Sequence, residues 1–535
     1  MTTCFTNPGT SEMHFVAALD SASEMRAVLG LFEGVATGAA DGYARMADRP
    51  GATLLHLGSG LGNGLANLHN ARRARVPIVN IVGDHATHHA QYDAPLQSDI
   101  ETVARNFSGW VRTSQTTERL GADAAEAIAA ATGPPGQVAT LILPADVSWS
   151  DGAQPAAPPA PPAPPIASEE TVTAVAEALR SRGSSALLLG GRALRAPVLR
   201  AAGRIADATG ARVLAEAFPT RLERGAGLPP VERLAYLAEL ASVQLAGLDH
   251  LILVDAKVPI SFFAYPGKRS ELVPKRCEVH ELATGAQDVL GTLEALTQAL
   301  DAAGAESELQ PAARAPAPSG QLDADAVCQA IGAAMPEGAI VSDESQTSGV
   351  TLAPHTVGAP PHDLLTLTGG AIGQGLPVAV GAAIACPDRP VIALEADGSA
   401  MYTIQSLWTM AREQLDVTVV ILNNRSYAIL NIELQRVGAR AGGPKARSQL
   451  DLAGPNVDFV ALGQSMGVPS SRAESADELT RSLTHALAEP GPHLIEAVIP
   501  SVYSGMRLRA MPHALRLLER LPRPLARAVK RRVYP

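Results

Sequence analysis

Short apolar runs alternate with longer helical patterns along most of the chain. Strands of a buried parallel sheet read as continuous apolar runs, and each needs a crossover to the next strand, which is commonly a helix. The alternation therefore predicts α/β domains whose parallel sheets are flanked by helices. The runs that carry this prediction are PIVNIVG at 77–83, ATLILP at 139–144, ALLLGG at 186–191, HLILVD at 250–255, PVIALEAD at 390–397 and VTVVILNN at 417–424.

Two stretches rich in proline and alanine divide the chain, one at 154–165 and the other at 310–319. Such segments form extended linkers, because proline fixes φ and lacks the amide hydrogen that helices and sheets need. A chain of 535 residues is also too long for one ordinary domain. We therefore expect three α/β domains followed by a tail, with the boundaries 1–153, 166–305, 320–500 and 501–535.

Composition and charge exclude several classes of protein. Hydrophobic residues make up 46% of the chain, and the formal charge of −10 offers no positive field for a phosphate backbone, so we expect no nucleic-acid partner. The four cysteines form no C-x-x-C pair, which suggests neither a zinc site nor a disulfide framework. We find neither a signal-peptide pattern nor an apolar run of membrane-spanning length, and a cytoplasmic protein is the default expectation.

The most informative polar positions lie in the third predicted domain. One apolar run leads into Asp397, Gly398 and Ser399, and the next leads into Asn424, 27 residues after Asp397. That spacing accommodates a helix and a strand, so Asp397 and Asn424 are expected side by side at the carboxyl ends of parallel strands. Their oxygens suit Mg²⁺, while Gly398 admits a close backbone approach and Ser399 lies at a helix start that suits a diphosphate. Two plain turns would explain either half of the pattern alone.

The segment 396–424 resembles the G-D-G-S…N-N signature of thiamine-diphosphate-dependent enzymes, and within them the acetolactate synthase and benzoylformate decarboxylase branch. The resemblance implies thiamine diphosphate and Mg²⁺ as cofactors. It also implies that Asp397, Asn424 and the main-chain carbonyl of Ser426 are the protein ligands of the metal. Ala396 stands where the family usually has glycine, a change that removes no ligand.

Two further segments of this domain resemble cofactor loops of the same family. In TGGAIG at 368–373, Ile372 takes the place of the bulky apolar residue that bends the cofactor into a V shape, and Gly370 lies beside it. In DESQTS at 343–348, Thr347 is the candidate hydroxyl for the diphosphate. A buried isoleucine between glycines and an ordinary helix N-cap are the alternative explanations.

The first domain carries the candidate for cofactor activation. Glu33 lies in FEGVATGAADGYAR at 32–45, which resembles the family's E-x₆-A-D-G-Y-A-R segment. The resemblance implies that Glu33 hydrogen-bonds the pyrimidine ring and favours its imino form. Small apolar neighbours would partly desolvate this carboxylate and favour sharing of its proton. A lone glutamate on an exposed helix is otherwise simply solvated.

Two other segments resemble benzoylformate decarboxylase. His56, at the start of HLGSGLGNG, takes the place of a substrate-facing histidine that acts in proton transfer, and Thr10 takes the place of a substrate-binding serine in NPGTSE at 7–12. A buried structural His56 is the alternative. At the place of the family's second active-site histidine, in the middle domain, this chain has Phe262 and Phe263. One proton-transfer group is therefore missing or replaced.

Three histidines cluster in DHATHH at 84–89. Pyruvate-type decarboxylases have a His-His pair after the corresponding strand, so His88 and His89 are candidates for contact with substrate. A surface loop explains the cluster slightly better. The middle domain lacks the glycine-rich FAD pattern of acetolactate synthases, although Gly190-Gly191 is a weak remnant, and we expect no flavin.

The C-terminal tail from 507 to 535 contains nine Lys or Arg residues and the single acid Glu519, with leucines at helical spacing. A lid over the active site, a helix on a neighbouring subunit and a helix on an anionic membrane all fit this pattern. Because basic tails are more often solvated, membrane contact is the least favoured of these.

The resemblance covers about residues 5–500 and implies an activity. We expect a 2-oxo acid decarboxylase or acetolactate synthase-like carboligase that forms an enamine on the cofactor after carbon–carbon cleavage. A 2-hydroxyacyl-CoA lyase-type or acyl-transferring relative is the alternative enzyme, and a non-catalytic cofactor-binding homologue is the alternative outside catalysis. In the family the active site lies between the first domain of one subunit and the third of another, which implies a homodimer or homotetramer.

Overall fold

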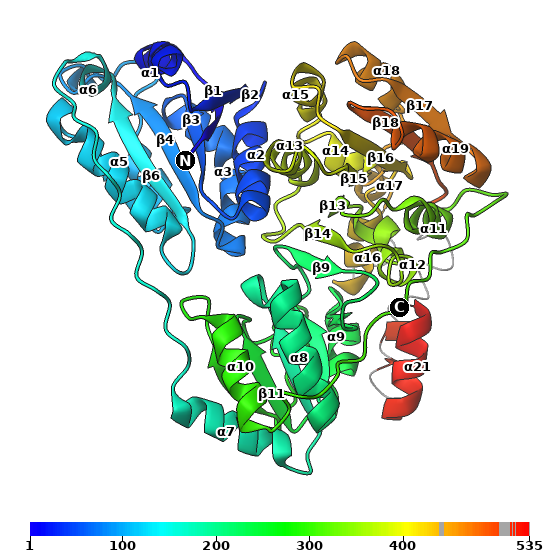
Figure 1. Ribbon diagram of the computed structural model, residues 1–535. Coiled ribbons are helices and arrows are strands. Elements are labelled where there is room, and N and C mark those ends of the chain that lie inside the picture. Colours follow the sequence, from blue (N-terminus) through cyan, green and yellow to red (C-terminus); the bar gives the residue numbers. More distant parts are fainter. Residues whose placement is uncertain (438–442, 502–513, 516, 519–520, 534–535) are drawn as a thin grey trace.

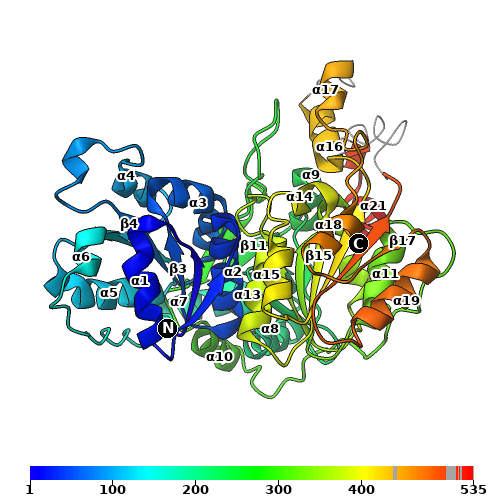
Figure 2. The same ribbon diagram turned by 90° about the horizontal axis from the view of Figure 1, so that it is seen from above.

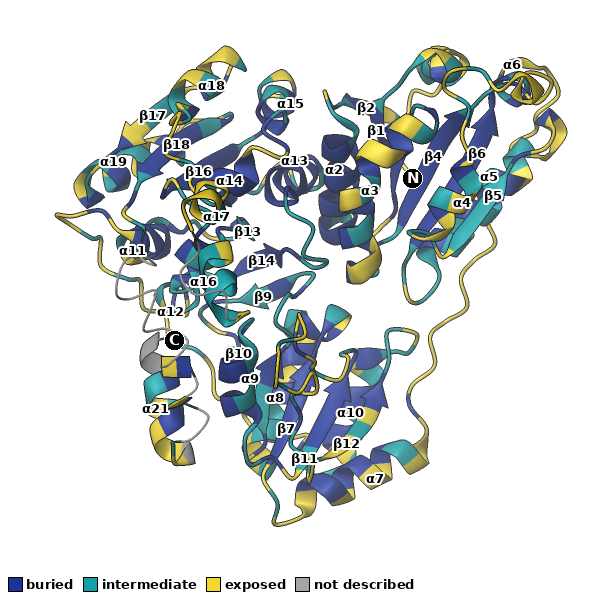
Figure 3. Cartoon of the chain, turned by 180° about the vertical axis from the view of Figure 1, so that it is seen from behind, coloured by how far each residue is buried: buried dark blue, intermediate teal, exposed yellow. Residues whose placement is uncertain are grey.

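Three β-sheets, each flanked by helices, form the three lobes of the molecule (Figure 1). The computed structural model describes residues 1–437, 443–501, 514–515, 517–518 and 521–533. Within these residues, neighbouring strands of the sheets run parallel except for one pair, so the predicted α/β class is confirmed. In Figure 3 the central strands are buried, whereas the linker between the first and second lobes is exposed.

The first sheet has six strands in the order β2-β1-β3-β4-β6-β5. Two of the predicted apolar runs form its central strands β4 and β6, which are almost entirely buried. The strands are β1 (Thr3–Asn7), β2 (Arg26–Leu29), β3 (Gly51–Leu55), β4 (Ile78–Asp84), β5 (Trp110–Thr113) and β6 (Val138–Pro144). The helices are η1 (Thr10–Glu12), α1 (Met13–Ala18), η2 (Leu19–Ser21), α2 (Glu33–Ala47), α3 (Leu57–Ala74), η3 (Ala90–Tyr92), α4 (Ile100–Arg105), α5 (Thr117–Thr132) and α6 (Ala145–Trp149).

The second sheet has five strands in the order β10-β8-β7-β11-β12. Alternate residues of three of its strands, β7, β8 and β11, pack into separate apolar clusters on the two faces of the sheet, as the pleat requires. The strands are β7 (Ser185–Leu189), β8 (Arg212–Ala215), β10 (Glu232–Arg233), β11 (His250–Val254) and β12 (Glu278–Ala283), and the helices are α7 (Glu169–Arg180), η4 (Gly191–Leu194), α8 (Ala196–Thr209), α9 (Ala238–Leu245) and α10 (Val289–Ala299).

The third sheet has seven strands in the order β17-β18-β16-β15-β13-β14-β9. Its edge strand β9 (Leu222–Arg224) comes from the middle segment of the chain and pairs antiparallel with β14. The other strands are β13 (Ile340–Glu344), β14 (His362–Thr366), β15 (Val391–Ala396), β16 (Val417–Asn423), β17 (Ser470–Ala473) and β18 (His493–Val498). The helices are α11 (Ala324–Ala334), η5 (Gln346–Gly349), α12 (Leu352–His355), α13 (Gly375–Ala385), α14 (Asp397–Ala400), α15 (Ser406–Arg412), α16 (Ala428–Arg436), α17 (Pro444–Ser448), α18 (Phe459–Ser465) and α19 (Ala476–Ala486).

Helices α2 and α13 join the first and third lobes, which lie side by side in Figure 2. A Cβ atom on Gly42 would lie 2.1 Å from the carbonyl oxygen of Val378, and one on Gly381 would lie 1.9 Å from that of Ala39. Any larger side chain at these two positions would therefore separate the helices. The glycines let the two backbones touch and fix how the lobes meet.

The proline-rich segments at 154–165 and 310–319 contain neither helix nor strand, as expected of linkers. The strand that the middle segment contributes to the third sheet shows, however, that sheets and chain segments do not coincide. None of the described helices is long and apolar enough to cross a membrane.

The described part of the tail lies against the second lobe of its own chain. Leu515 and Leu518 are buried in a cluster with Leu240 of α9. Helix α21 (Arg523–Val533) follows, and its Lys530 pairs with Glu232 at 3.1 Å. The apolar stripe is thus covered within the chain at these positions. Residues 502–513, 516, 519–520 and 534–535, which include four of the nine basic residues of the tail, lie outside the described residues.

Candidate active site

The structure brings Asp397 and Asn424 together, as their spacing predicts. Strands β15 and β16 are parallel neighbours, with Ala396 opposite Leu422, so both side chains emerge at the same edge of the third sheet. One carboxylate oxygen of Asp397 accepts the Gly398 amide at 2.9 Å, and the other accepts the Arg425 amide at 2.6 Å. The aspartate therefore holds the turn that carries Asn424.

The turn after β16 completes a set of oxygen donors. Arg425 adopts a left-handed backbone conformation (φ 56°), which turns the chain back so that the Ser426 amide donates to the Asn424 side-chain oxygen at 2.9 Å. The Asn424 amide nitrogen faces the Ser348 hydroxyl at 3.4 Å. Of the hydroxyls in the loop at 343–348, the one that reaches this group is thus Ser348, whereas the predicted Thr347 is a half-buried neighbour.

The surroundings of the Asp397 carboxylate favour binding of a cation. Its side chain is buried, and burial raises its pKa to about 6 although backbone amides oppose the shift. Within the described residues, no lysine, arginine or histidine forms an ion pair with it. A hard divalent ion that takes carboxylate, amide and main-chain oxygens fits this chemistry. Asp397, Asn424 and Ser426 are the residues that could hold it.

The TGGAIG loop lies between strand β14 and helix α13. Gly370 (φ 78°) and Gly373 (φ 95°) flank Ile372, which is half-buried. The Asn67 side-chain amide of α3 donates to the carbonyl of Gly373 at 3.2 Å and to that of Gly34, next to Glu33, at 2.8 Å. One side chain therefore links the start of α2 to the loop that carries Ile372.

Phe262 covers this loop from the middle segment. A Cβ atom on Gly370 would lie 2.5 Å from the tip of the Phe262 ring. The ring also packs against Phe218, Tyr236 and Phe263, with centroids 5.7, 5.4 and 5.1 Å away. The resemblance placed Phe262 and Phe263 at the site of a missing histidine, and the structure indeed puts an aromatic ring beside the loop.

Glu33 is the first residue of α2, whose following residues from Gly34 to Met46 are buried. Its own side chain is half-exposed and accepts a hydrogen bond from Asn63 of α3 at 3.0 Å. Within the described residues no hydrogen bond or ion pair joins Glu33 to Asp397, Asn424 or Ser426.

His56 forms a pair with Glu12 that sequence reasoning missed. Its Nδ1 lies 2.8 Å from the Glu12 carboxylate, and Gly9 donates its amide to the same oxygen at 2.7 Å. A Cβ atom on Gly9 would lie 2.3 Å from the His56 ring, so only glycine fits there. Glu12 was visible in the NPGTSE motif, but its burial was not. Thr10, the predicted substrate-binding residue, is exposed beside this pair.

The histidine loop after β4 is an exposed surface feature at the same edge of the first sheet. The His88 ring lies 3.8 Å from the Asp146 carboxylate, and the His89 ring packs near His85 and Tyr92. No hydrogen bond within the described residues joins either histidine to His56 or Glu33. Their contact with a substrate stays a prediction.

Comparison with known proteins identifies the family. Residues 1–105 match the N-terminal TPP binding domain of thiamine pyrophosphate enzymes, and residues 347–497 match the C-terminal TPP binding domain. A Mycobacterium tuberculosis protein, IlvX, which is assigned only provisionally as an acetolactate synthase large subunit, is 59% identical over 93% of this chain and 96% of its own length. The chain belongs to the thiamine-diphosphate-dependent enzyme family.

Two further relatives of this thiamine-diphosphate-dependent enzyme are decarboxylases. Benzoylformate decarboxylase of Pseudomonas aeruginosa is 31% identical, with 93% of this chain and 96% of that protein covered. Among solved structures, the 4-hydroxybenzoylformate decarboxylase of Rhodococcus jostii RHA1 superposes with a TM-score of 0.81 and 26% identity, covering 94% of this chain and 97% of that one.

This thiamine-diphosphate-dependent enzyme also buries an acid pair that the sequence did not single out. Glu344 accepts the Gly373 and Gly375 amides at 2.8 and 2.6 Å, so it anchors the Ile372 loop. Glu395, on the neighbouring strand, is fully buried, and among the described residues neither of its carboxylate oxygens has a hydrogen-bond partner. Burial raises the pKa of Glu344 to about 7, and burial together with Glu344 raises that of Glu395. The position of Glu395 inside the apolar run VIALEAD was the sequence feature that could have indicated a buried acid.

We expect Glu395→Gln to stabilise the protein above pH 7. As pH rises from about 4.5 through about 7, the unfolded chain ionises both carboxyls freely, while the folded protein must ionise them without water, so the stability of the wild type falls. The amide cannot ionise, and we expect a gain of about 1–3 kcal/mol. Urea unfolding between pH 4.5 and 8 measures it.

The matched control is Glu496→Gln. Glu496 is equally buried, but it accepts from Asn423 at 2.7 Å and pairs with Arg472 at 2.9 Å. Loss of that charge should destabilise the protein. If Glu395→Gln and Glu496→Gln lost stability equally, the prediction that Glu395 and Glu344 carry an uncompensated buried charge would be contradicted.

Proposed function

We propose that this chain is a thiamine-diphosphate- and Mg²⁺-dependent enzyme that decarboxylates a 2-oxo acid and either releases an aldehyde or joins the product to a second carbonyl compound. The observation that carries the proposal is the buried Asp397 carboxylate, which lacks a cationic side chain and lies beside Asn424 within the C-terminal TPP-binding domain. The decarboxylases and the acetolactate synthases among its relatives support the reaction class.

Each residue of the proposed site has a separate role. Bound thiamine diphosphate supplies an electron sink for cleavage of the bond next to a carbonyl. Asp397 and Asn424 would hold the metal, whose charge would neutralise the diphosphate. Glu33, which accepts a hydrogen bond from Asn63, would share a proton with the pyrimidine ring. Glu12 lies within hydrogen-bond distance of His56 Nδ1, so it can orient the ring and leave Nε2 to exchange a proton with the substrate.

We further propose that a second copy of the chain completes the site. Glu33 is half-exposed in the single chain, yet proton sharing by a carboxylate is favoured by exclusion of water. Large apolar side chains are exposed next to both halves of the site, namely Leu31 beside Glu33, and Met401 and Tyr402 beyond Ser399. Burial of these side chains against a partner would stabilise a dimer or tetramer.

The aromatic cluster around Phe262 suggests which substrates fit. It supplies an apolar wall beside Gly370 in place of the histidine of benzoylformate decarboxylase. An apolar wall favours 2-oxo acids with large apolar side chains over pyruvate, because it stabilises them by burial of their surface. The relatives named for aromatic 2-oxo acids are consistent with this choice.

We expect the holoenzyme to convert aromatic or branched 2-oxo acids, and Glu33→Gln to lose about 10²–10⁴-fold of that activity. The amide keeps the shape of the side chain but cannot share a proton. Mass spectrometry of products formed with and without added aldehydes measures conversion and separates decarboxylation from carboligation. Exposed Glu24→Gln is the control for loss of charge in the same domain. No product from any 2-oxo acid would instead favour an acyl-CoA lyase-type enzyme or a non-catalytic homologue.

Asp397→Ala should weaken Mg²⁺-dependent binding of thiamine diphosphate by more than about 100-fold, because removal of a direct ligand costs more than loss of an outer contact. Titration calorimetry measures this, and circular dichroism shows whether the fold survives. Asp416→Ala, at the amino end of the same strand pair, is the control and should bind as the wild type does. Wild-type affinity in the Asp397 variant would remove this residue from the metal site.

The Gly190-Gly191 turn supports the expectation that no flavin binds. The amides of Gly191 and Arg192 already donate to the carboxylates of Glu216 at 2.9 Å and Asp255 at 2.8 Å. Arg75 of the first domain fills the same turn and pairs with Asp255 at 2.5 Å. A flavin diphosphate would meet the buried Asp255 and the partly buried Glu216 there, and both amides already have partners, which opposes its binding.

We expect the purified protein to be colourless and fully active without added FAD. Absorbance between the ultraviolet and the visible, together with activity before and after addition of FAD, provides the measurement. A yellow protein that contains about one flavin per chain, released on denaturation, would contradict this prediction, whereas the roles of Glu33 and Asp397 would be unaffected.

A further inference from the structure

Three potential metal ligands meet at the amino ends of two strands of the second sheet. Strands β11 and β12 are parallel neighbours, and their first residues, His250 and Glu278, are paired in register. His280 lies two residues after Glu278 and therefore points to the same face of the sheet. Apolar residues, including Ile252 and Leu282, continue this face into the core.

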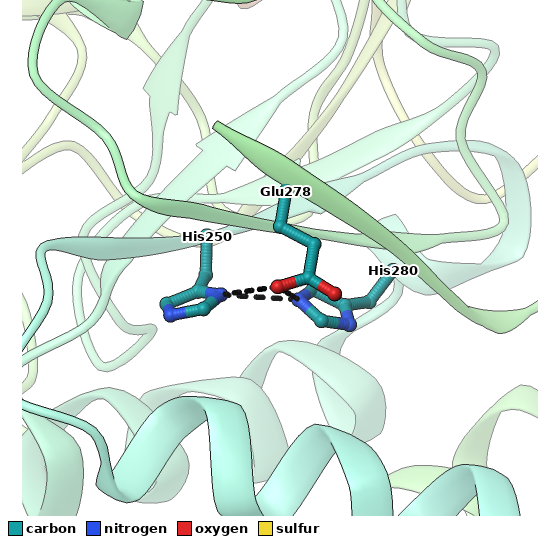
Figure 4. A group of neighbouring side chains, drawn as sticks. All are labelled: His250, Glu278 and His280. Carbon is teal, nitrogen blue, oxygen red and sulfur yellow. Dashed lines mark hydrogen bonds and ion pairs between the residues drawn. The ribbon is translucent and has the colours of Figure 1, made fainter. Parts of the chain in front are cut away.

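The three side chains point toward one another from the two strands (Figure 4). His250 Nδ1 lies 3.1 Å from His280 Nε2, and the same oxygen of Glu278 lies 3.8 Å from the first nitrogen and 3.9 Å from the second. The imidazoles are mostly covered, with 17% and 16% of their side chains exposed, whereas the Glu278 side chain is 67% exposed. The group is thus open on the carboxylate side.

These distances fit a single small ion. A point equidistant from the three ligand atoms lies about 2.1 Å from each, which is the distance of zinc from imidazole nitrogen and carboxylate oxygen. We propose that His250, Glu278 and His280 bind Zn²⁺ or a similar transition-metal ion, with water in the open position. Two imidazoles and a carboxylate are a donor set that zinc accepts, while Mg²⁺ requires oxygens.

This site is separate from the candidate active site. The ligands come from the amino ends of β11 and β12 in the second lobe, whereas Asp397 and Asn424 lie at the carboxyl ends of strands in the third. Strand β12 is an edge strand, held on one side alone. A metal bound by His250 of the inner strand and two residues of β12 would tie that edge to the sheet, so its role is structural.

Sequence spacing could not reveal this group. His250 and Glu278 are 28 residues apart, with no cysteine pair or short histidine repeat to mark them. Only the register of two parallel strands makes them neighbours. A direct hydrogen bond between the two imidazoles is the competing explanation for their approach, and it requires no metal.

The test uses the full chain saturated with thiamine diphosphate and Mg²⁺, so that zinc does not enter the active site. Titration calorimetry with Zn²⁺ should show one site per chain, and Zn²⁺ should raise the unfolding temperature. Co²⁺ in its place should give the visible absorption of a four-coordinate ion. His280→Gln should weaken Zn²⁺ binding by more than about 100-fold. Glu278→Gln changes an exposed side chain, leaves the fold intact and should weaken binding as well.

His485→Ala is the matched control. His485 and His493 form another imidazole pair, with ring centroids 6.0 Å apart, but in the part of the chain that the structure describes they belong to no group of three potential metal ligands. This variant should bind Zn²⁺ as the wild type does. Unchanged Zn²⁺ affinity in both His280→Gln and Glu278→Gln would overturn the proposal, as would absence of saturable binding to the wild type. Loss of Zn²⁺ binding when the Mg²⁺ concentration is raised to that of Zn²⁺ and slightly above would also overturn it, because a site of two imidazoles should prefer zinc.

Discussion

The contact between helices α2 and α13 sets the geometry on which the candidate active site depends. Gly42 and Gly381 allow the helix backbones to touch. The fully buried Asp41–Arg45 ion pair lies within α2, and Arg45 donates across the junction to the Thr366 carbonyl at 2.9 Å. Substitution of either partner would strongly destabilise the fold, because the other charge would be left buried without a counter-charge. Glu33 begins one of these helices and the Ile372 loop leads into the other. The packing of two helices therefore positions two segments of the candidate active site that are more than 300 residues apart in sequence.

Three buried acids at the carboxyl edge of the third sheet, Asp397, Glu344 and Glu395, differ in how their charge can be compensated. Asp397 accepts hydrogen bonds from amides of its own turn and lies beside oxygens that suit a divalent ion, so the metal proposed for this site would offset the energetic cost of its burial. Glu344 and Glu395 have no such ion to meet, and sharing a proton is the alternative open to them. Because Glu344 also anchors the amides of Gly373 and Gly375, the protonation of this pair is tied to the shape of the cofactor loop.

Local patterns along the chain allowed much of this structure to be predicted. The apolar runs became central strands, the proline-rich stretches became linkers, and the positions of Asp397 and Asn424 followed from the rule that parallel strands end at one edge. Contacts between distant segments escaped prediction. The burial of Glu12 against His56, the approach of Phe262 to Gly370 and the choice of Ser348 over Thr347 depend on how whole segments pack. No periodicity encodes such contacts.

Strand β9 has a mechanical consequence. It leaves the middle segment to pair with β14, and Arg221 just before it forms an ion pair with Asp363 at 2.5 Å. The second lobe therefore cannot swing freely on its proline-rich linkers, because any such rotation would first break hydrogen bonds of the third sheet. Excision of the second lobe, in turn, would leave β14 as a bare sheet edge, a surface prone to pairing with other chains. The middle segment thus restrains the lobe that carries Asp397 and Asn424, and it covers the edge strand β14 of the third sheet.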